Sequence, residues 1–381
     1  MEPAATDTGI HTVDDPATLP VVAFDVGPLS GPRTGIGSAV ASLQQALQQH
    51  PGLQLEPYLV SFRADHEPGV SRLPLPAALA HRLWARIDRP RVDRWMRSAQ
   101  VVHGTNYVVP PTTLPRLVSV YDCWFLRHPK QAHPDVVRAG RVLIHAIERG
   151  AVVHASSQAT ATALHEIIPT AEVHVVHLGA IPLPPPTSHC PIPELDGTDF
   201  VLAVATIERR KNLPRLVAAF GSIAQRHHAL RLVIAGGNGD DRSAVDASID
   251  ALPSDVGARV MMTGYVGDDA RSWLLRHARV LAYPSLDEGF GFPLLDAMQV
   301  GLPIVASTAG SIPEVAGPAA LTVDADDVEA LGEALHRVLV DDDVRAQLIG
   351  HAPAQLDRFA WTGTAAAMIA LYSDLYRRTT G

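Results

Sequence analysis

Short apolar runs of strand length alternate with segments of helical periodicity along most of the chain. In the first half, strand-like runs alternate with helix-like segments, whose apolar residues recur at helical spacing. The predicted strands are 19–24, 101–103, 117–121, 152–155 and 173–177, and the predicted helices are 36–49, 135–149 and 157–167. This alternation predicts a mostly parallel α/β sheet covered by helices.

A proline-rich stretch divides this pattern into two series. Residues 181–193 contain six prolines and can continue neither a sheet nor a helix, so they predict a stiff linker. A second series of strands follows, at 200–205, 230–235, 260–262, 280–283, 304–306 and 320–323. At 381 residues the chain also exceeds the size of most single cores. We therefore expect two doubly wound, Rossmann-like domains that face a central cleft, with ligands at the carboxyl ends of the strands.

The expected boundaries follow from these features. They are a disordered leader over 1–19, a first domain over 20–181, a linker over 182–198, a second domain over 199–360 and a last helix within 361–381.

Composition narrows the function classes. The chain is 47% hydrophobic and 19% charged, as in ordinary globular proteins, and its net charge of −9 without a dense basic tract argues against a nucleic-acid partner. Residues 1–20 carry no Lys or Arg and no signal-like apolar core, and no run approaches a membrane span, which predicts a cytoplasmic protein. Cys123 and Cys190 are the only cysteines, so a disulfide framework or a cysteine metal site is not expected.

Residues 81–97 combine six arginines with two tryptophans and two aspartates. Basic faces mixed with Trp are typical of helices that lie on an anionic membrane surface. Pro90 interrupts this segment, and arginine is the usual cation throughout the chain, so a solvated pair of helices is the alternative. Peripheral contact with the inner face of a membrane through 81–97 is thus one expectation.

The stretch that begins at Glu288 is the most informative part of the sequence. The glycine turn Gly289-Phe290-Gly291-Phe292 follows a predicted strand, and Pro293 fits the first turn of a helix. The free N–H groups of that helix start favour an anion such as a pyrophosphate. Glu288 and Asp296 would flank it with carboxylates, which accept hydrogen bonds from sugar and ribose hydroxyls. The stretch therefore predicts a sugar-nucleotide pocket, the alternative being two unrelated solvated acids.

A cationic segment opens the second domain. Arg210 and Lys211 follow its first predicted strand and precede a helix, where a phosphate would offset their unfavourable position at a helix start. Arg210 can fork onto phosphate oxygens, and Lys211 supplies a compact point charge. Lys211 and Lys130 are the only lysines among 31 basic residues, which suggests a specific role. A solvated helix start is the alternative.

Glycines also follow predicted strands. Gly35 and Gly37, in a glycine-rich turn before a helix, would let backbone N–H groups approach a ligand closely. Gly236 follows the strand at 230–235 and gives a weaker signal of the same kind. Plain tight turns explain both equally simply. No complete dinucleotide fingerprint follows the strand at 200–205, which disfavours an oxidoreductase.

Polar residues end three strands. His103, Tyr121 and Asp122 end apolar strands of the first domain, where they would enter the cleft and touch the transferred sugar or the acceptor. A hydrogen-bonded structural histidine is the alternative for His103. Glu314 follows a strand next to the Glu288 loop, where it is equally well explained as an ordinary acid in a first helical turn.

Four segments occur in an order typical of a known family. They are Glu208-Arg-Arg-Lys-Asn212, Pro284-Ser-Leu-Asp-Glu-Gly-Phe-Gly-Phe-Pro293, Ala297-Met298 with Gly301, and Pro313-Glu-Val315. Together they resemble glycosyltransferase family 4. The similarity extends to Thr34–Gly37, 103–110, Tyr121-Asp122 and Phe359–Trp361, so it covers nearly the whole chain.

The resemblance implies a GT-B fold and a retaining transfer of a hexose-type sugar from a nucleotide diphosphate, without a cofactor or bound metal. By the same resemblance, Glu288 would hold donor-sugar hydroxyls, Asp296 the ribose, and Arg210 with Lys211 the diphosphate. Gly35 and Gly37 would approach the donor phosphates and the acceptor. Mannose from a guanosine diphosphate donor is the first guess, with uridine and adenosine donors as alternatives. The acceptor would be a carbohydrate, a lipid-linked molecule or another small molecule.

Two positions depart from the family pattern. Asp296 stands where Glu is usual, which shortens the side chain by one methylene and keeps the carboxylate. Tyr121 stands where a His that contacts the donor sugar is usual, while Asp122 is retained. A sugar-nucleotide-binding protein with impaired turnover, acting as a partner or regulator, is therefore the alternative function.

Overall fold

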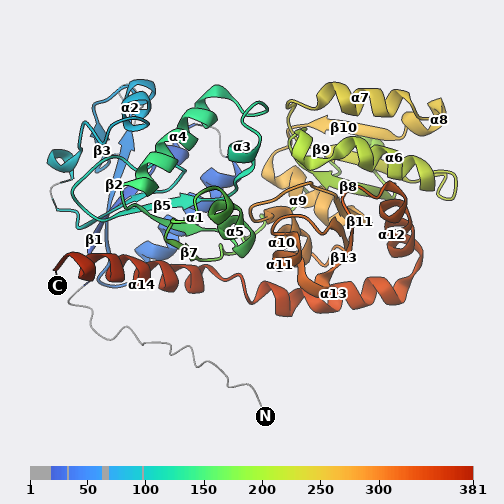
Figure 1. Cartoon of the computed structure of the whole chain (residues 1–381). Helices are drawn as coiled ribbons and strands as arrows, with labels where there is room; N and C mark the ends of the chain where they lie inside the picture. Colours follow the sequence, from blue (N-terminus) through green and yellow to red (C-terminus); the bar gives the residue numbers. More distant parts are fainter. Residues whose placement is uncertain (1–18, 32–33, 62–67, 97, 381) are drawn as a thin grey trace, which may run out of the picture.

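The computed structural model describes residues 19–31, 34–61, 68–96 and 98–380. The predicted leader at 1–19 lies outside this part except for its last residue. Two α/β domains stand side by side, each built on one parallel sheet (Figure 1).

The first domain contains a seven-stranded sheet in the order β3-β2-β1-β4-β5-β6-β7, with every neighbouring pair parallel. Its strands are β1 Val21–Asp25, β2 Gln54–Val60, β3 Ser71–Leu73, β4 Val101–Gly104, β5 Arg116–Val120, β6 Val152–Ala155 and β7 Val173–Val175. Its helices are α1 Gly35–Gln48, α2 Ala77–Trp84, α3 Trp124–Arg127, α4 Pro134–Glu148 and α5 Gln158–Ile167, with short 3-10 turns η2 Gly27–Leu29 and η3 Asp93–Trp95.

The second domain contains a six-stranded parallel sheet in the order β10-β9-β8-β11-β12-β13. Its strands are β8 Phe200–Val204, β9 Arg231–Ala235, β10 Val260–Gly264, β11 Val280–Tyr283, β12 Ile304–Ser307 and β13 Ala320–Val323. Its helices are α6 Leu213–Ile223, α7 Arg242–Asp250, α8 Ser254–Gly257, α9 Asp268–His277, α10 Phe292–Gln299, α11 Ile312–Ala316, α12 Val328–Val340 and α13 Asp342–Leu356, with 3-10 turns η5 Arg209–Lys211 and η6 Gly317–Ala319.

The chain passes between the domains twice. The proline-rich segment reaches β8 with one 3-10 turn, η4 Pro193–Leu195, as its only regular element. The last helix, α14 Trp361–Thr380, runs back along the first domain (Figure 1). Its buried Met368 and Tyr372 join Phe24 of β1 and Leu43 of α1 in one apolar cluster. The C-terminal helix thus belongs to the core of the first domain.

The predicted strands and helices occur within a few residues of their expected bounds. Strands β2 and β3 were not predicted. Glu56 and Pro57 interrupt the apolar pattern of β2, and β3 has only three residues at the edge of the sheet. Pairing with β1 compensates for this weak local signal, because five residues of each strand lie in register.

Candidate functional site

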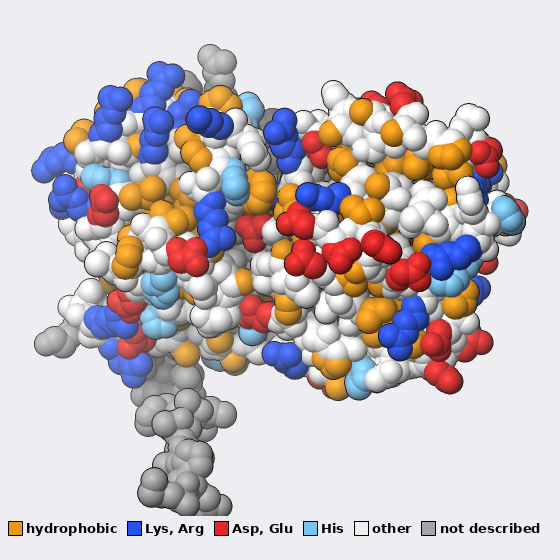
Figure 2. All heavy atoms as spheres, turned by 45° about the vertical axis from the view of Figure 1, so that its right-hand side comes forward, with side chains coloured by type: hydrophobic (Ala, Val, Ile, Leu, Met, Phe, Trp, Pro, Cys, Tyr) orange, Lys and Arg blue, Asp and Glu red, His pale blue; other side chains and the backbone are white. Residues whose placement is uncertain are grey.

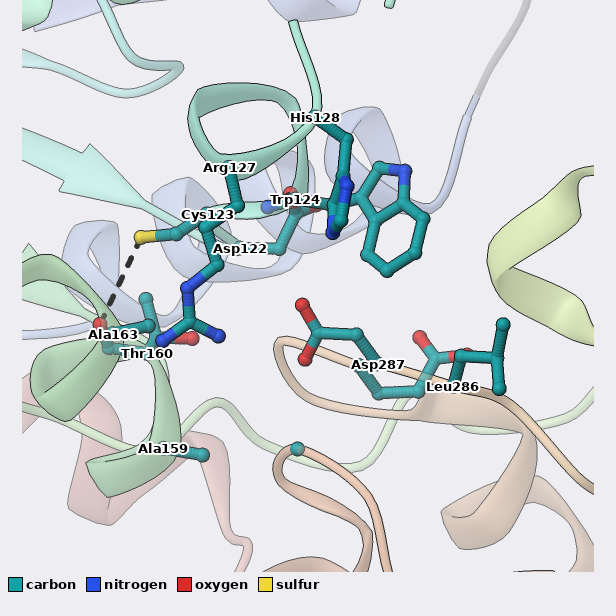
Figure 3. A pocket seen from close by; sticks show the side chains of 12 residues that line it. Asp122, Cys123, Trp124, Arg127, His128, Ala159, Thr160, Ala163, Leu286 and Asp287 are labelled. Atoms are coloured by element: carbon teal, nitrogen blue, oxygen red, sulfur yellow. Dashed lines mark hydrogen bonds between the residues drawn. The ribbon is translucent and has the colours of Figure 1, made fainter. Parts of the chain in front are cut away.

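The segments after four strands, β5, β6, β11 and β12, meet between the domains and line a cavity of about 240 Å³. From the first domain, Asp122 to His128 follow β5, and Ala159, Thr160 and Ala163 belong to α5. From the second domain, Leu286, Asp287 and Glu288 follow β11, and Gly310 follows β12 (Figure 3). The cavity therefore lies where parallel α/β sheets usually bind ligands.

Glu288 is the centre of a buried charge cluster in the second-domain wall. Its side chain is 6% exposed and accepts hydrogen bonds from Lys211 Nζ at 2.5 Å and Arg210 Nη1 at 2.9 Å. Ser285 Oγ donates a third hydrogen bond at 2.6 Å, and Arg210 also pairs with Glu208 at 2.9 Å. Glu288, Arg210 and Lys211, three of the four predicted catalytic residues, thus lie in direct contact.

Opposite charges control ionisation within this cluster. Burial alone would favour the neutral acid, but the charges of Lys211 and Arg210 outweigh it and lower the pKa of Glu288 to about 2. Burial lowers the pKa of Lys211, and Glu288 opposes that shift. Burial also disfavours charge on Arg210, yet Glu288 and then Glu208 raise its pKa. The cluster is therefore an ion-paired network at neutral pH.

Backbone conformation fixes the cationic segment against the Glu288 loop. Asn212 has φ of +57°, the left-handed region, and joins η5 to α6. Its amide Nδ2 donates to the carbonyls of Pro284 and Ala325 at 3.0 and 2.8 Å. Leu286 N donates to Arg210 O at 2.7 Å. These contacts hold the strained residue in place and position Arg210 and Lys211 beside Glu288.

The Glu288 loop touches the first domain at Gly289. A Cβ at this position would lie 1.5 Å from Tyr121 O, so only glycine allows the approach. Two first-domain hydroxyls, Ser156 Oγ and Thr160 Oγ1, lie 3.0–3.2 Å from both Tyr121 O and Gly289 O. The cleft is therefore closed at this point through backbone carbonyls and hydroxyls.

Asp122 is the predicted catalytic residue of the first-domain wall. Its Oδ1 accepts from Trp124 N at 3.1 Å, and its Oδ2 accepts from Tyr107 Oη at 3.2 Å. Tyr107 is buried, has φ of +58° and packs edge-on against Phe125 at 4.9 Å. A tyrosine in this conformation is unusual, so its hydroxyl is held at Asp122 by the packing around it.

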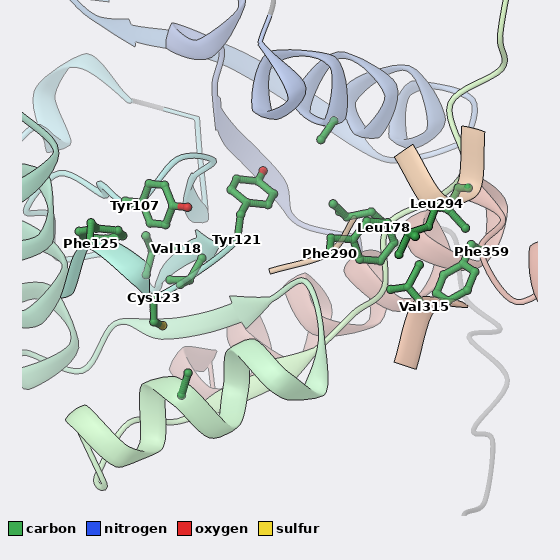
Figure 4. Packing of buried hydrophobic residues seen from close by; sticks show 14 of the residues in the cluster. Tyr107, Val118, Tyr121, Cys123, Phe125, Leu178, Phe290, Leu294, Val315 and Phe359 are labelled. Atoms are coloured by element: carbon green, nitrogen blue, oxygen red, sulfur yellow. The ribbon is translucent and has the colours of Figure 1, made fainter. Parts of the chain in front are cut away.

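Tyr121 does not direct its side chain into the cleft. Its hydroxyl donates to Thr105 O at 2.9 Å, and its ring lies edge-on to Tyr107 within the first domain (Figure 4). The backbone carbonyl of Tyr121, and not the phenol, reaches the second domain. The expected contact of this side chain with a sugar is therefore absent from this arrangement.

His103 lies in the interior of the first domain, contrary to the expected contact with sugar or acceptor. Its ring is 0% exposed and is hydrogen-bonded to Tyr372 Oη of α14 and Ser119 Oγ of β5, each at 2.8 Å. Ser119 Oγ is also hydrogen-bonded to His154 Nδ1, at 2.8 Å. Burial lowers the pKa of His103 well below its usual value and that of His154 to about 4. His103 thus joins α14 to the sheet.

Asp296 lies inside α10 and is 2% exposed. Its Oδ2 pairs with Arg271 Nη1 of α9 at 2.6 Å, a contact that the sequence did not predict. Burial raises the pKa of Asp296 to about 6, and Arg271 opposes this shift. The expected ribose carboxylate is therefore occupied by a cation that is itself only a quarter exposed.

Three of the glycines predicted to bind the donor lie in turns outside the cavity. Gly37 lies in the first turn of α1, where Thr34 Oγ1 accepts its N–H and a Cβ would approach Pro28 O to 2.9 Å. Gly35 begins the same helix and has open space around it. Gly236 passes so close to Ala205 O that a Cβ would lie 1.8 Å away. None of the three lines the cavity described above.

Three further predicted residues form the start of α10. Gly291 has φ of +103° and precedes the helix, and Phe290 packs edge-on against Phe292 at 5.3 Å. Phe290 is buried and also contacts Phe359, the residue two positions before α14, at 5.6 Å (Figure 4). The glycine turn therefore anchors the helix through aromatic packing.

Glu314 also joins the two domains, at the start of α5. Its carboxylate accepts from Gln158 N at 2.9 Å and Ala159 N at 3.3 Å, the first turn of α5. His177 Nε2 lies 2.5 Å from the same carboxylate. Burial opposes ionisation of Glu314, but His177 and these N–H groups lower its pKa. The acid thus complements a helix start in the other domain.

Several site residues escaped the sequence analysis. Trp124, Arg127, His128 and Asp287 line the cavity, and Tyr107 and Arg271 pair with Asp122 and Asp296. The sequence could have indicated them only through their position, since 124–128 follow the predicted site residue Asp122 and Asp287 precedes the predicted site residue Glu288. No group of three or more His, Cys, Asp or Glu residues that could hold a metal ion occurs among the described residues.

Comparisons with known proteins agree with this geometry. Residues 189–355 match the family model for glycosyl transferases group 1, a segment that contains Arg210, Lys211, Glu288 and Asp296. The chain is similar to sucrose-phosphate synthase from Thermosynechococcus elongatus, with a TM-score of 0.71, 19% identity and coverage of 94% of this chain and 100% of the other. It is also similar to Anabaena HepE in complex with UDP and glucose, with a TM-score of 0.69, 17% identity and coverage of 93% and 100%.

The fold is GT-B. The predicted two-domain architecture is thereby confirmed, and the cavity lies between the two halves of this GT-B chain. The charge cluster belongs to the second GT-B domain, inside the segment that matches the glycosyl transferase model.

Curated relatives match mainly through a shorter stretch. The chain is 31% identical to O-antigen chain mannosyltransferase B from Escherichia coli over 183 residues, which is 48% of each protein. It is 29% identical to phosphatidyl-myo-inositol mannosyltransferase from Mycolicibacterium smegmatis over 171 residues, 44% of this chain and 43% of that one. The matched part of the chain thus spans less than half the length of these relatives.

Proposed function

We propose that this GT-B protein is a glycosyltransferase that moves a hexose-type sugar from a nucleotide diphosphate to an acceptor hydroxyl, with retention of configuration. The observation that carries this proposal is the contact of Glu288 with both Lys211 and Arg210 in the cleft wall. The match of this segment to the glycosyl transferase model and the mannosyltransferase relatives support it. Mannose is our proposal for the sugar, and a guanosine, uridine or adenosine diphosphate for the donor.

The charge cluster suits a departing diphosphate. In the proposed step the bond between the anomeric carbon and the diphosphate oxygen breaks, and that carbon bonds to the acceptor oxygen on the same face. The acceptor proton passes to the departing diphosphate oxygen. Arg210, Lys211 and the N–H groups at the start of α10 would stabilise the charge that develops there. Because Glu288 already fixes both cations, little reorganisation accompanies this step.

Asp122 and Glu288 would bind substrate hydroxyls from opposite walls. Both are carboxylates at the cavity, and ionised carboxylates accept hydrogen bonds from O–H donors. Asp296 would serve the ribose only if Arg271 moves away or bridges to the nucleotide, because the two side chains are paired. Neither a metal nor a cofactor has a role in this proposal.

A screen of nucleotide sugars by thermal shift tests donor binding. A ligand at 100 times its dissociation constant stabilises the folded state by about 2.7 kcal/mol. We expect one of GDP-mannose, UDP-glucose and ADP-glucose to raise Tm and to be consumed by the protein. If Lys211→Ala and Glu288→Ala both leave sugar transfer unchanged, the assignment of the site is wrong.

The orientation of Tyr121 favours one alternative, a sugar-nucleotide-binding regulator without turnover. Its phenol is bonded inside the first domain, so no side chain at position 121 reaches the cleft. Tight donor binding without hydrolysis or transfer would favour this alternative. Even slow consumption of the donor would contradict it.

We also propose peripheral contact with an anionic membrane, at the cytoplasmic face, through α2 and the segment after it. Leu79 and Ile87 are 51% and 49% exposed, and Arg82, Arg86 and Arg89 in the same stretch of sequence are exposed too. Figure 2 shows Lys and Arg side chains gathered over the upper part of the first domain. Apolar residues among arginines suit anionic headgroups. No helix among the described residues is long and apolar enough to cross a membrane.

Vesicle flotation tests this contact. We expect the protein to float with phosphatidylglycerol vesicles and not with phosphatidylcholine vesicles. Replacement of both Leu79 and Ile87 by Glu should abolish flotation without changing Tm by more than about 2 °C, because both side chains are exposed. Equal flotation of the double variant would contradict the proposal.

A further inference from the structure

The cavity between the domains has an aromatic side that the proposed donor site does not use. Trp124 and His128 project from α3 and the residue after it, with ring centroids 4.0 Å apart and planes inclined by 37°. Both rings are partly exposed and line the cavity, and Figure 3 shows them above Asp287. The indole therefore presents an apolar surface to whatever occupies this space.

The charge around the cavity is mainly negative. Asp122, Asp287 and Glu288 contribute three carboxylates, and Arg127 is the one cation among the lining residues. Arg127 is already paired with Glu166 outside the cavity lining. An anionic ligand would meet more repulsion than attraction here.

Asp287 is the carboxylate with unused hydrogen-bonding capacity. Among the described residues, no group donates a hydrogen bond to it, whereas Asp122 and Glu288 each accept several. Figure 3 shows its carboxylate directed toward Arg127 and the space under Trp124. Burial and then the charge of Asp122 raise its pKa, as expected for an acid without a donor. Hydroxyl groups of a ligand would supply the donors.

Size and chemistry together narrow the ligand class. The volume of about 240 Å³ equals roughly eight water molecules in the liquid, which is enough for one sugar ring. A pyranose ring has an apolar C–H face, which stacks on an aromatic ring, and an edge of hydroxyls, which donate to carboxylates. Trp124 and Asp287 offer this pair of surfaces.

We propose that this cavity binds one uncharged pyranose ring of the acceptor, stacked on Trp124 and hydrogen-bonded to Asp287, and that it rejects phosphorylated sugars. This inference rests on the proposed function, because it assigns the acceptor of that transfer. Eight of the twelve lining residues belong to the first domain, opposite the proposed donor cluster. Like charge at Asp122 and Asp287 supplies the rejection.

Acceptor competition tests the substrate class. The protein is given the donor that raises its Tm, together with methyl α-glycosides of mannose, glucose, galactose and N-acetylglucosamine or with the 6-phosphates of the same sugars. We expect at least one neutral glycoside to be glycosylated with kcat/KM about tenfold or more above that of its phosphate. Transfer only to phosphorylated sugars, or to no neutral sugar, overturns the inference.

Substitutions in the cavity distinguish binding of the acceptor from binding of the donor. Asp287→Asn should raise KM for the neutral acceptor about tenfold and Trp124→Ala about fivefold, with KM for donor hydrolysis within about twofold of wild type. Asp287→Lys should reverse the preference toward the phosphorylated sugar. Asp255→Asn, an exposed aspartate on α8, is the matched control and should change none of these values.

The outcomes distinguish this inference from the proposed function. If Asp287→Asn and Trp124→Ala raise KM for the donor instead, the cavity holds the donor sugar, and this inference is wrong while glycosyl transfer stands. If wild-type protein binds and consumes no nucleotide sugar, the proposed function fails and this inference fails with it.

Discussion

The two walls of the cleft carry charge in different ways. In the second domain, buried Glu288 pairs with two cations, Arg210 and Lys211, through short contacts. In the first domain, Asp122 and the neighbouring Trp124 and His128 are only partly buried, and Asp122 is held by neutral donors. The charge cluster of the second domain is thus organised before a ligand arrives, whereas the first-domain wall leaves Asp122 and the rings of Trp124 and His128 partly exposed to one.

This difference assigns separate tasks to the walls. A preorganised cluster of cations suits a diphosphate, whose charge changes during the reaction. Partly exposed carboxylates and an aromatic ring suit recognition of a neutral ligand. Changes in the second wall should therefore affect stability and chemistry together, and changes in the first wall should affect activity and substrate selection with little loss of stability.

Glu288→Gln should have the largest effect. It leaves Lys211 buried without its anion, so we expect a loss of about 3–5 kcal/mol in the free energy of unfolding. Sugar transfer should fall at least about 100-fold, because the cations lose their positions. Urea denaturation and initial rates measure both. A variant as stable as wild type would contradict the preorganised cluster.

His154→Gln should change how the free energy of unfolding depends on pH, because His154 is a buried neutral histidine in the core of the first domain. Unfolded His154 titrates near pH 6.5, whereas burial keeps the folded ring neutral down to its pKa of about 4. Its contribution to stability is therefore lost as pH falls from about 6.5 to 4, by roughly 3 kcal/mol. The gap in unfolding free energy between wild type and His154→Gln should narrow by that amount.

The wild type must be compared with the variant at each pH, because Asp25 changes the stability of both proteins with pH in the opposite direction to His154. Burial raises its pKa to about 7, so it adds stability as pH falls below 7. The contribution of Glu288 to stability is lost only at lower pH. Its pKa is about 4.5 in the unfolded state and about 2 in the folded state, so this contribution decreases as pH falls below about 4.5. A gap that stays constant between pH 7 and 4 would contradict a neutral buried His154.

Asp122→Asn should reduce transfer about 10- to 100-fold while changing the unfolding free energy by less than about 1 kcal/mol. The amide keeps one oxygen for the bond from Trp124 N or Tyr107 Oη but removes the negative charge at the cavity. Equal losses of stability in Asp122→Asn and Glu288→Gln would show that the two walls are not different.

Tyr121→Phe should have the smallest effect on activity. Its hydroxyl bonds Thr105 O inside the first domain, so its removal should cost about 1 kcal/mol of unfolding free energy. Transfer should stay within about twofold of wild type, because the phenol does not face the cleft. A loss of activity above tenfold would show that Tyr121 turns toward the substrate during the reaction.

Sequence patterns were sufficient to predict features that depend on residues close together in the chain. The strand and helix series predicted both sheets, and the glycine turn before Pro293 predicted the start of α10. They failed for β2, whose pairing with β1 outweighs a weak local signal. For His103 they left two alternatives open, and the structure has the hydrogen-bonded structural histidine and not the sugar contact. Arg271 and Asp296 meet across two helices, and no local pattern reports such a contact.

Hydrophobic periodicity and backbone chemistry are local properties, so the amino-acid pattern was enough to predict the two-domain α/β organisation and the segments that carry the charged and glycine-rich turns. Which of these residues meet depends on the fold. Lys211 and Glu288 lie 77 positions apart and form a hydrogen-bonded ion pair, and Trp124 and Asp287 face one cavity from different domains. Charge pairing and burial depend on distances in space, so the fold alone assigned Tyr121 and His103 to the interior and Asp287 to the cleft.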